Sequence, residues 1–438
     1  MVPSDAPDLP DATSAVAARQ RDRRYVWHTW SPVNAARRHP MFSHGDGYRL
    51  WDVDGREYLE GSALNSTCGY AHPDVVRAIA EQASRLQHVD LSLSTHELAG
   101  VLAERLAAYL PDPLNRTLFV NSGSEGFDAA LLMAVQHVRH AGRPRSRVVS
   151  FARGYQGATL LSRSLSSLPR NRHPLAPPLP VTLVDLPVPP RELRRPESLP
   201  VLLDAFARAL DADPAEPPAA VVVEPFLNVG GGVVLPDGFL TGLRRLCDQA
   251  GALLILDEVF TAYGRCGRMY AVNREEVVPD IVVSSKGLAG GYAAIAAVTV
   301  TDRIHDGFAS DPVIGGLRYG HTTSGHAVAC AAALATLDVV EKEQLAERAE
   351  RLGAVLVDRL APLAGSGDVV DVRGLGLVVA LQTTSEAAAT AVVERARKAG
   401  LLLRRQSDAV LIVPPLVIDD EGVDQLLTRL AVALPAPD

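Results

Sequence analysis

A succession of short, continuous apolar runs constrains the fold of this chain more than any other feature. The runs are rich in Val, Ile and Leu and read LFV at 118, VVSF at 148, VTLVDL at 181, AVVVE at 220, LLILDEV at 253 and IVVSS at 281. Segments with helical spacing separate several of them, such as Phe127, Leu131, Val135 and Val138 after the first. Strands without a polar face are buried on both sides, as in a parallel sheet covered by helices. The sequence therefore predicts an α/β fold around a mostly parallel sheet.

The regions on either side of these runs have a different pattern. RLWDVDGREYLE, which turns at Asp54 and Gly55, predicts a β-hairpin. After about residue 326, helices, a strand pair near 369 to 382, a helix at 386 to 399, a strand at 409 to 413 and a last helix predict a smaller α+β unit. Residues 187 to 218, rich in Pro and Arg, predict a surface excursion with one helix, VLLDAFARAL. We therefore expect a mobile tail over 1–22, an N-terminal segment over 23–74 that packs with the small domain, a large domain over 75–325 and a C-terminal small domain over 326–438.

Composition excludes several classes of protein. The chain has 438 residues and a formal net charge of −8, and it has no long Lys or Arg block, which argues against a nucleic-acid partner. The four cysteines lie far apart without a CxxC pair, and the 12 histidines form no HExxH motif, so no metal site is expected. No run of about 18 apolar residues predicts a membrane span. The expected location is the cytoplasm.

Two residues at strand ends carry the strongest chemical signal. Lys286, in PDIVVSSKGLAGGY, follows an apolar strand, where burial would lower the pKa of its amine and free it to form a Schiff base. Asp257, in LLILDEVFTAYGRCG, closes a strand and needs a cationic partner such as a protonated pyridine nitrogen. Each also has an ordinary interpretation, since a lysine at a strand end is usually solvated and an aspartate there often caps the next turn. Glu258 is expected on the opposite side of the strand.

A phosphate site is predicted where FVNSGSEGFDAALLMAVQHV passes from a strand through a Ser/Gly turn into a helix. Free backbone N–H groups and the helix dipole attract an anion there, and Ser122 and Ser124 add hydroxyl donors. The alternative is an ordinary N-cap, with Ser124 bonding into the first turn. The segment has neither the Walker A nor the GxGxxG pattern, so ATP and NAD are not indicated.

Further side chains follow two other strands. Tyr155, in FARGYQGAT, could lie flat on a planar cofactor or could simply pack. Glu224 and Asn228, in AVVVEPFLNVGGG, follow another strand. Ligands of open α/β sheets gather beyond the carboxyl ends of the strands. A lysine for an imine, an aspartate for a pyridinium, a helix start for a phosphate and a tyrosine for stacking together indicate pyridoxal 5′-phosphate (PLP).

From about Tyr25 to its C-terminus the chain resembles the class III aminotransferases, PLP-dependent transferases of fold type I. The motifs that carry the resemblance are WDVDGREYLE, GYAHPDVVRAIAEQ, NSGSEGFDAA, GYQGAT, EPFLNVGGGVVLPDGFL, LDEVFTAYGRCG, PDIVVSSKGLAGGY, HTTSGHAVACAAALATL, DVRGLG and VPPL. The resemblance implies a large domain with a seven-stranded sheet, a smaller α+β domain, and a homodimer with shared active sites.

The resemblance also assigns roles in the site. Lys286 would hold the cofactor as a Schiff base, Asp257 would pair with the pyridine nitrogen, and Val259 and Tyr155 would pack on the two ring faces. The residues expected at the phosphate and around the cofactor are Ser122, Gly123, Ser124, Glu224 and, from the neighbouring subunit, Thr322.

The sequence says less about which residues bind the substrate than about which bind the cofactor. Within the class the chain is most similar to members that act in biotin biosynthesis, through RRYVWHTWSP and KGLAGGYAAIAAV. Trp30 stands where those enzymes have a tyrosine, and Ala63 and Leu64 stand near their tryptophan pair. The resemblance leaves two candidates for a substrate carboxylate, Arg404 and Arg373.

The expected reaction moves an amino group from an amino acid or amine donor to a keto or aldehyde acceptor. The alternative is another PLP reaction, namely decarboxylation, racemisation, or elimination and replacement with C–C bond formation, with S-adenosylmethionine as a candidate substrate. Three departures from the class favour keeping that alternative, because Gln156, Ala262 with Tyr263, and Ala327 replace the usual residues of YHG, TGFGR and GHP.

Overall fold

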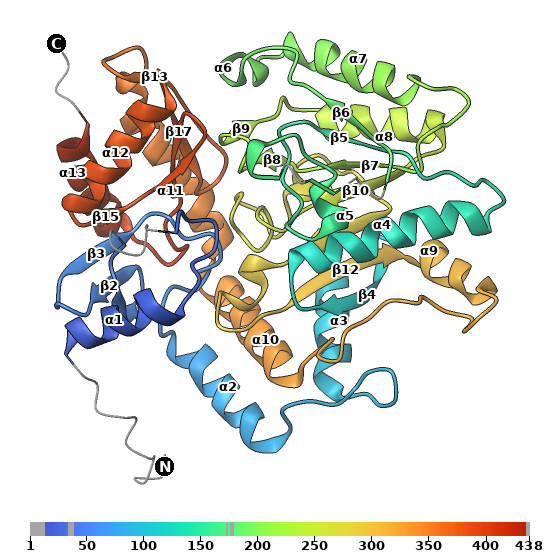
Figure 1. Cartoon of the computed structure of the whole chain (residues 1–438), viewed down its shortest axis with the longest axis horizontal. Helices are drawn as coiled ribbons and strands as arrows, with labels where there is room; N and C mark the ends of the chain where they lie inside the picture. Colours follow the sequence, from blue (N-terminus) through green and yellow to red (C-terminus); the bar gives the residue numbers. More distant parts are fainter. Residues whose placement is uncertain (1–13, 34–38, 172–173, 176–178, 435–438) are drawn as a thin grey trace.

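The computed structural model describes residues 14–33, 39–171, 174–175 and 179–434. The chain forms two lobes, a large one around a seven-stranded sheet and a smaller one built from both ends of the sequence (Figure 1).

The large lobe is organised by one sheet. Its strands, in spatial order, are β4 (Leu114–Val120), β12 (Ala296–Thr301), β11 (Ile281–Ser284), β10 (Leu253–Asp257), β7 (Ala220–Val223), β5 (Val148–Phe151) and β6 (Val181–Val184). All neighbours pair in parallel except β12, which is antiparallel to both β11 and β4. The predicted α/β fold with a mostly parallel seven-stranded sheet is confirmed. The apolar runs did not predict strand β12, because its alanines and threonines make it less hydrophobic than the other strands.

Helices cover both faces of this sheet. The helices of the large lobe are α2 (Pro73–Arg85), α3 (Glu97–Tyr109), α4 (Gly123–His140), α5 (Leu160–Arg163), α6 (Pro190–Leu193), α7 (Ser198–Leu210), α8 (Phe239–Ala250) and α9 (Asp302–Gly307). Alternate strand residues enter separate cores: Ile255 packs in the core that contains α4, and Leu254 in the core that contains α7 and α8. Burying each such side chain stabilises the fold by about 1.5–3 kcal/mol, which is why these strands have no polar face. The predicted surface excursion holds α6 as well as α7.

The small lobe joins the two ends of the chain. One of its sheets contains β1 (Phe42–Asp46), β2 (Arg49–Asp52), β3 (Glu57–Glu60) and β15 (Leu401–Leu402); the other contains β13 (Val369–Gly374), β14 (Val379–Thr383), β17 (Ala409–Ile412) and β16 (Arg404–Gln406). The helices are α10 (Ala327–Lys342), α11 (Leu345–Leu360), α12 (Glu386–Lys398) and α13 (Asp420–Ala433). Strand β3 pairs in parallel with β15, so the N-terminal segment lies against the C-terminal unit. The predicted hairpin at Asp54 and Gly55 is confirmed as β2 and β3, whereas β15 and β16 are too short to be read from the sequence.

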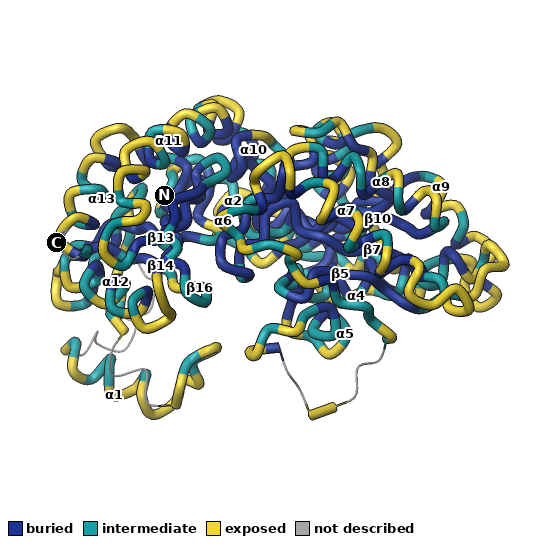
Figure 2. The backbone as a smooth tube through the Cα atoms, turned by 90° about the horizontal axis from the view of Figure 1, so that it is seen from above, coloured by how far each residue is buried: buried dark blue, intermediate teal, exposed yellow. Residues whose placement is uncertain are grey.

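The N-terminus differs from the expected mobile tail. Residues 15 to 22 belong to helix α1 (Ala15–Tyr25), and residues 1–13 lie outside the described part of the chain. Helix α1 has no buried residue and stands at the edge of the molecule (Figure 2). Its Ala and Arg residues have high intrinsic helix propensity, which accounts for the helix without a core.

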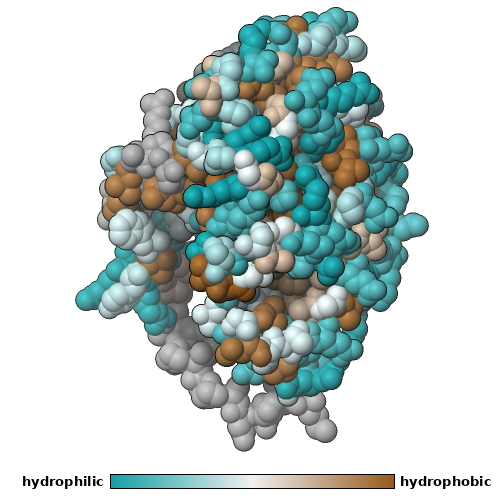
Figure 3. All heavy atoms as spheres, turned by 90° about the vertical axis from the view of Figure 1, so that its right-hand side faces the viewer, coloured by the Kyte–Doolittle hydropathy of each residue, from teal (hydrophilic) through white to brown (hydrophobic). Residues whose placement is uncertain are grey.

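Figure 3 shows the side of the molecule turned away from the small lobe. That face is mostly hydrophilic, with apolar side chains in small separate groups (Figure 3). Among the described helices none is long and apolar enough to cross a membrane.

Candidate active site

Loops that follow neighbouring strands enclose a cavity of about 430 Å³ at the carboxyl edge of the large sheet. Its lining includes most of the predicted site residues, namely Ser122, Gly123, Ser124, Tyr155, Asp257, Val259 and Lys286. Four predicted strand-to-loop junctions, after β4, β5, β10 and β11, therefore meet at the cavity, because these strands all run in the same direction.

Lys286 occupies a constrained position in this cavity. It follows β11 and begins the short 3-10 helix η4 (Lys286–Ala289), with a backbone φ of +31°. A non-glycine residue in this region costs about 1–3 kcal/mol and persists only where its surroundings hold it. The restraints lie on each side, because Ser285 Oγ donates to the Ile295 carbonyl (3.1 Å) and Thr67 Oγ1 donates to the Gly287 carbonyl (3.0 Å). Burial lowers the pKa of the Lys286 amine, and the charges of Asp257 and Glu224 oppose this shift.

Asp257 caps the turn after its strand and also presents a carboxylate oxygen that could take a cationic partner. Its Oδ1 accepts the Val259 N–H (3.0 Å), so it does cap the turn after β10. The side chain also faces the cavity, and no described residue donates a hydrogen bond to Oδ2. Burial raises the pKa of Asp257 to about 7, with the Lys286 charge acting in the opposite direction. A cation beside Oδ2 would favour the charged carboxylate.

Glu258 lies on the other side of the strand, as expected. Its carboxylate accepts the N–H groups of Ala271 (3.0 Å) and Val272 (2.7 Å) and the Thr261 hydroxyl. It is a structural group without access to the cavity.

The start of α4, where the sequence predicts an anion site, has a different cap from the one considered in the sequence analysis. The N-cap is Ser122 and not Ser124: Ser122 Oγ accepts the Glu125 N–H (3.3 Å), and Glu125 Oε2 accepts the Ser122 N–H (3.1 Å) in a capping box. Ser124 Oγ instead accepts the Ala158 N–H (3.0 Å) and ties the helix start to the loop after β5. A Cβ at Gly123 would lie 2.9 Å from Cγ2 of Val259, so only glycine allows this approach of helix and wall.

Tyr155 also lines the cavity. Its N–H donates to Oε1 of Glu224 (2.8 Å), which fixes the loop after β5 to the end of β7. Trp30 packs edge-on against the Tyr155 ring at 6.1 Å between centroids, so the N-terminal segment reaches the site. Burial raises the pKa of Glu224 well above its ordinary value, and the Asp257 charge adds to the effect.

Two amide side chains beside Glu224 keep free acceptors. Gln156 Oε1 and Asn228 Oδ1 are buried without a hydrogen-bond partner among the described residues. Buried polar atoms are nearly always satisfied, and those that are not require an explanation. Gln156 lines the cavity, so a ligand with a donor group would satisfy its oxygen; Asn228 is not among the lining residues.

The two candidate arginines differ. Arg373, in β13, has a fully buried side chain; its guanidinium donates to the carbonyls of Gly231 (2.7 Å) and Gly232 (2.6 Å), to Asp371 (2.8 Å) and to Gln382 (2.7 Å). Its donors are committed within the protein, so it lies outside the cavity as a structural group. Arg404, in β16, has no ion-pair partner among the described residues, and its buried Nε has no acceptor.

Thr322 is exposed and makes no contact with the cavity of its own chain. Its neighbour Thr323 donates to Asn121 Oδ1 (2.8 Å), which joins the loop of Thr322 to the residue before the α4 cap.

Several cavity residues were not singled out from the sequence. They are Asn65, Asn121, Gly157, Ser285, Gly291, Ala293, Ala294 and Ile295. Most belong to the segments already chosen, but Asn65 comes from the loop after β3 and had no signal beyond a run of Asn, Ser and Thr. Only the packing of the small lobe brings it to the cavity.

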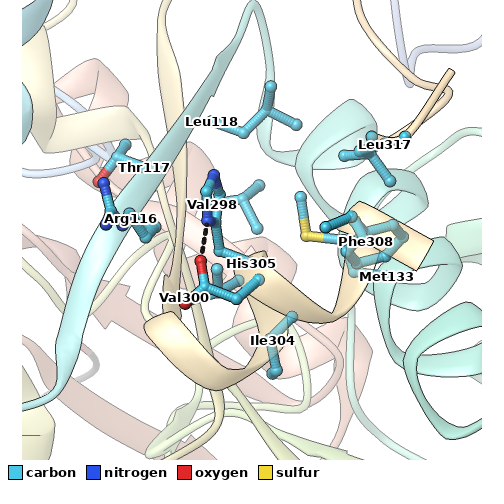
Figure 4. Close-up of a pocket in the computed structure, with 14 residues that line it drawn as sticks. Arg116, Thr117, Leu118, Met133, Val298, Val300, Ile304, His305, Phe308 and Leu317 are labelled. Carbon is cyan, nitrogen blue, oxygen red and sulfur yellow. Dashed lines mark hydrogen bonds and ion pairs between the residues drawn. The ribbon is translucent and has the colours of Figure 1, made fainter. Parts of the chain in front are cut away.

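A second cavity, of about 490 Å³, lies between α4, β4, β12 and α9. Apolar side chains, including Leu118, Met133, Phe308 and Leu317, converge on it (Figure 4). Its charged rim is paired within the protein, since Arg116 bonds Asp302 and His305 bonds Asp306. It offers no nucleophile or unpaired acid, so the chemistry belongs to the first cavity. Among the described residues no group of three or more His, Cys, Asp and Glu side chains could hold a metal ion.

The fold and the first cavity together define the arrangement of a fold type I PLP enzyme. A family model for class III aminotransferases matches residues 31–434. The chain belongs to this family, and class III aminotransferases are PLP-dependent enzymes.

Individual relatives agree with this assignment. The chain is 34% identical to the adenosylmethionine-8-amino-7-oxononanoate aminotransferase of Nitratidesulfovibrio vulgaris, covering 97% of this chain and 82% of the relative. It is 33% identical to an omega-aminotransferase of Caulobacter vibrioides, covering 92% and 95% of the two chains. Among solved structures it is similar to an (S)-enantioselective omega-transaminase from Thermomicrobium roseum, with a TM-score of 0.90, 29% identity and coverage of 96% and 98%.

Proposed function

We propose that Lys286 is the residue that holds PLP and moves the proton during amino transfer, and that Asp257 holds the charge of the ring nitrogen. The observation that carries this proposal is the pairing of a buried amine and a buried carboxylate in one cavity, with the pKa of each shifted toward its neutral form. The cavity fits the cofactor, because Oδ2 of Asp257 lacks a donor, the start of α4 offers N–H groups, and Gly123 leaves room beside Val259.

When bound, PLP supplies an electrophilic carbon for the amine and an electron-withdrawing ring. The residues of the chain do the rest. The lowered pKa of Lys286 keeps part of its amine neutral, so its Nζ can accept and return a proton. Tyr155 and Val259, which both line the cavity, would contact the ring, and Glu224 fixes the Tyr155 backbone. Ser122, Gly123 and Ser124 bind the phosphate at the start of α4.

The proposed substrate carries an acid group that binds Arg404. This arginine suits the role because its buried Nε has no acceptor and burial lowers its pKa, a sign of a charge without full compensation. Arg373 is not proposed for substrate binding, since its donors bond Gly231, Gly232, Asp371 and Gln382. Trp30, beside Tyr155, is proposed to cover the substrate.

The proposed enzyme is a homodimer in which Thr322 of one subunit completes the phosphate site of the other. Its support is that Thr322 is exposed, while the same loop is anchored beside the phosphate site by Thr323 and Asn121. The proposed location is the cytoplasm, where the four buried free cysteines would stay reduced.

The names of the relatives indicate candidate substrates. Adenosylmethionine and 8-amino-7-oxononanoate appear in the names of one group of relatives, and another relative is named an omega-aminotransferase. A role in biotin-like or specialised metabolism follows as a proposal, with Ala63 and Leu64 as residues that would change the shape of the pocket.

The test is a donor panel on the purified holoenzyme. Alanine, glutamate, S-adenosylmethionine and a diamine are each mixed with the enzyme, and conversion of the cofactor to its pyridoxamine form is followed by absorbance. Conversion by at least one donor, reversed by a keto acid, supports amino transfer. Release of carbon dioxide, or racemisation of the donor, with the pyridoxal form retained would favour the alternative PLP reaction.

A further inference from the structure

The amine of Lys286 lies over an aromatic ring that the sequence analysis did not single out. Its Nζ is 5.9 Å from the centroid of the Phe260 ring. A Lys ammonium within about 6 Å of an aromatic centroid is attracted by the negative face of the ring. Among the described residues, Lys286 has no ion-pair partner and its amine makes no hydrogen bond. The ring is therefore the neighbour at short range that favours the charged form of this amine.

The turn after β10 brings Phe260 to this position. Asp257 and Val259 line the cavity, whereas Phe260 is buried beside it in a small apolar cluster. The Phe260 ring stacks on the ring of Phe226, with 6.1 Å between centroids and an angle of 30° between planes. Phe226 begins β8 (Phe226–Leu227), two residues after Glu224. The chain segments that supply the two buried carboxylates thus also supply a pair of stacked rings.

Packing alone does not require an aromatic side chain at residue 260. The other buried members of the cluster, apart from Phe226, are aliphatic, namely Val378, Ala380, Leu411 and Val413. A leucine at this position would also bury apolar surface against them. It would lack the negative face that attracts a cation. The ring of Phe260 therefore gives Lys286 an interaction that the rest of the cluster cannot supply.

Three charged groups act on the Lys286 amine in addition to this ring. Asp257 after β10 and Glu224 after β7 favour its charged form, and Arg404 in β16 opposes it. Burial outweighs the two carboxylates, so the pKa of the amine is lowered. Cation–π contacts are stronger where water is excluded. The Phe260 ring can thus retain part of the charge that burial disfavours.

We propose that Phe260 is a positioning residue, whose ring holds the Lys286 amine beside the cavity and favours its charged form whenever the amine is not attached to the cofactor. This inference rests on the proposed function of Lys286. In amino transfer the free amine takes a proton from the substrate and later returns it. The ring would fix where Nζ lies in that interval and how readily it gives up the proton.

The composition of the chain allows a direct measurement. It has three lysines, Lys286, Lys342 and Lys398. Reductive methylation of the cofactor-free protein with isotope-labelled formaldehyde gives one NMR signal for each lysine and one for the N-terminus. The signal that is absent from Lys286→Ala belongs to Lys286, and its chemical shift against pH gives the pKa. Phe260→Leu should lower this pKa by about one pH unit, which makes the amine about tenfold easier to deprotonate.

Two further variants separate the ring from packing. Phe260→Tyr keeps an aromatic face and should leave the pKa of Lys286 close to its value in the unmodified protein. Phe308→Leu is the matched control, because Phe308 is 5% exposed, as against 6% for Phe260, and lines the second cavity. It makes the same substitution away from Lys286 and should not change the pKa of that amine.

The pH profile of the holoenzyme gives a second readout. The acid limb of kcat for the best donor should move to lower pH by about one pH unit in Phe260→Leu, with little change in KM, because the amine loses its proton more readily. A role in packing alone would lower kcat by the same factor at every pH. Phe260→Tyr should restore the profile of the unmodified enzyme.

The outcomes distinguish this inference from the proposed function. An unchanged pKa of Lys286 in Phe260→Leu, or an equal fall in Phe260→Tyr, would overturn the inference and leave the attachment of PLP to Lys286 standing. Amino transfer by Lys286→Ala at the rate of the unmodified enzyme would overturn the proposed function as well. Circular dichroism checks folding, and if Phe260→Leu does not fold, Phe260→Met makes the same comparison with a more adaptable apolar side chain.

Discussion

Two clusters of buried charge in this enzyme differ in how completely their polar atoms are satisfied. At Arg373 every side-chain nitrogen has an acceptor, and the bonds from Arg194 and Arg373 lower the pKa of Asp371 although burial acts to raise it. In the cavity, Asp257 and Lys286 lack such partners, and burial shifts both pKa values toward the neutral forms. A satisfied charge cluster stabilises the junction of the lobes, whereas an unsatisfied one is available for a ligand.

We expect the largest effect, a loss of activity, from a substitution in the cluster of Asp257 and Lys286. Lys286→Ala should lower the rate of amino transfer by about a thousandfold or more, because it removes both the covalent attachment and the proton carrier. Single-turnover absorbance with the best donor measures the rate, and circular dichroism checks that the variant folds. Turnover within tenfold of the unmodified enzyme would contradict the assignment.

At the satisfied cluster we expect a loss of stability. Arg373→Ala leaves the carbonyls of Gly231 and Gly232 without their donor and leaves Asp371 with Arg194 as its guanidinium partner, and breaking a buried pair costs about 3–5 kcal/mol. Denaturant unfolding of the holoenzyme measures it. Arg194→Ala is the comparison, since the Arg194 side chain is 41% exposed and its loss should cost much less. Equal losses for the two variants would remove the distinction between the clusters.

Arg404→Gln should weaken substrate binding more than it lowers stability, whereas Arg373→Ala should mainly lower stability. Its KM for an acidic substrate should rise about 10–100-fold, as expected for loss of a hydrogen bond to a charged group. Its free energy of unfolding should change by less than about 1 kcal/mol, since Arg404 has no ion pair to lose. Steady-state kinetics and denaturant unfolding on one preparation decide between a binding and a structural role.

The smallest effect is a pH dependence of the enzyme without cofactor. The pKa of Asp257 is raised from 3.8 to about 7 on folding. The folded chain then binds more protons than the unfolded chain between these values, so its stability is greatest at low pH and falls as the pH rises through about 7. We expect this contribution to shift the melting temperature by a few degrees.

Calorimetric melting of the cofactor-free protein from pH 4 to pH 8 measures this dependence. Asp257→Asn should flatten it, and the loaded enzyme should show less of it because a cationic ring nitrogen favours the charged carboxylate. A slope that is the same in the unmodified protein and in Asp257→Asn would assign the dependence to other groups.

Some features of the fold and of the site could be predicted from the sequence, and others could not. The apolar runs gave the α/β fold because a strand buried on both faces needs continuous Val, Ile and Leu, and the carboxyl edge of the sheet then collected Ser124, Tyr155, Asp257 and Lys286. The alternative prediction of a Ser124 cap on α4 is wrong, although the sequence held the signal for Ser122: Ser122 and Glu125 have the S-x-x-E spacing of a capping box.

Sequence alone thus determined the class of enzyme, because strand burial and strand-end chemistry are local properties of the chain. The tertiary structure decided that Arg373 bonds to acceptors within the protein and that the Nε of Arg404 has no acceptor among the described residues. Arg373 and Arg404 lie in different strands of one sheet, but only Arg373 reaches acceptors far away in sequence, the Gly231 and Gly232 carbonyls, whereas the buried Nε of Arg404 has no acceptor among the described residues. Such contacts form only when the lobes pack together, so no spacing along the chain encodes them.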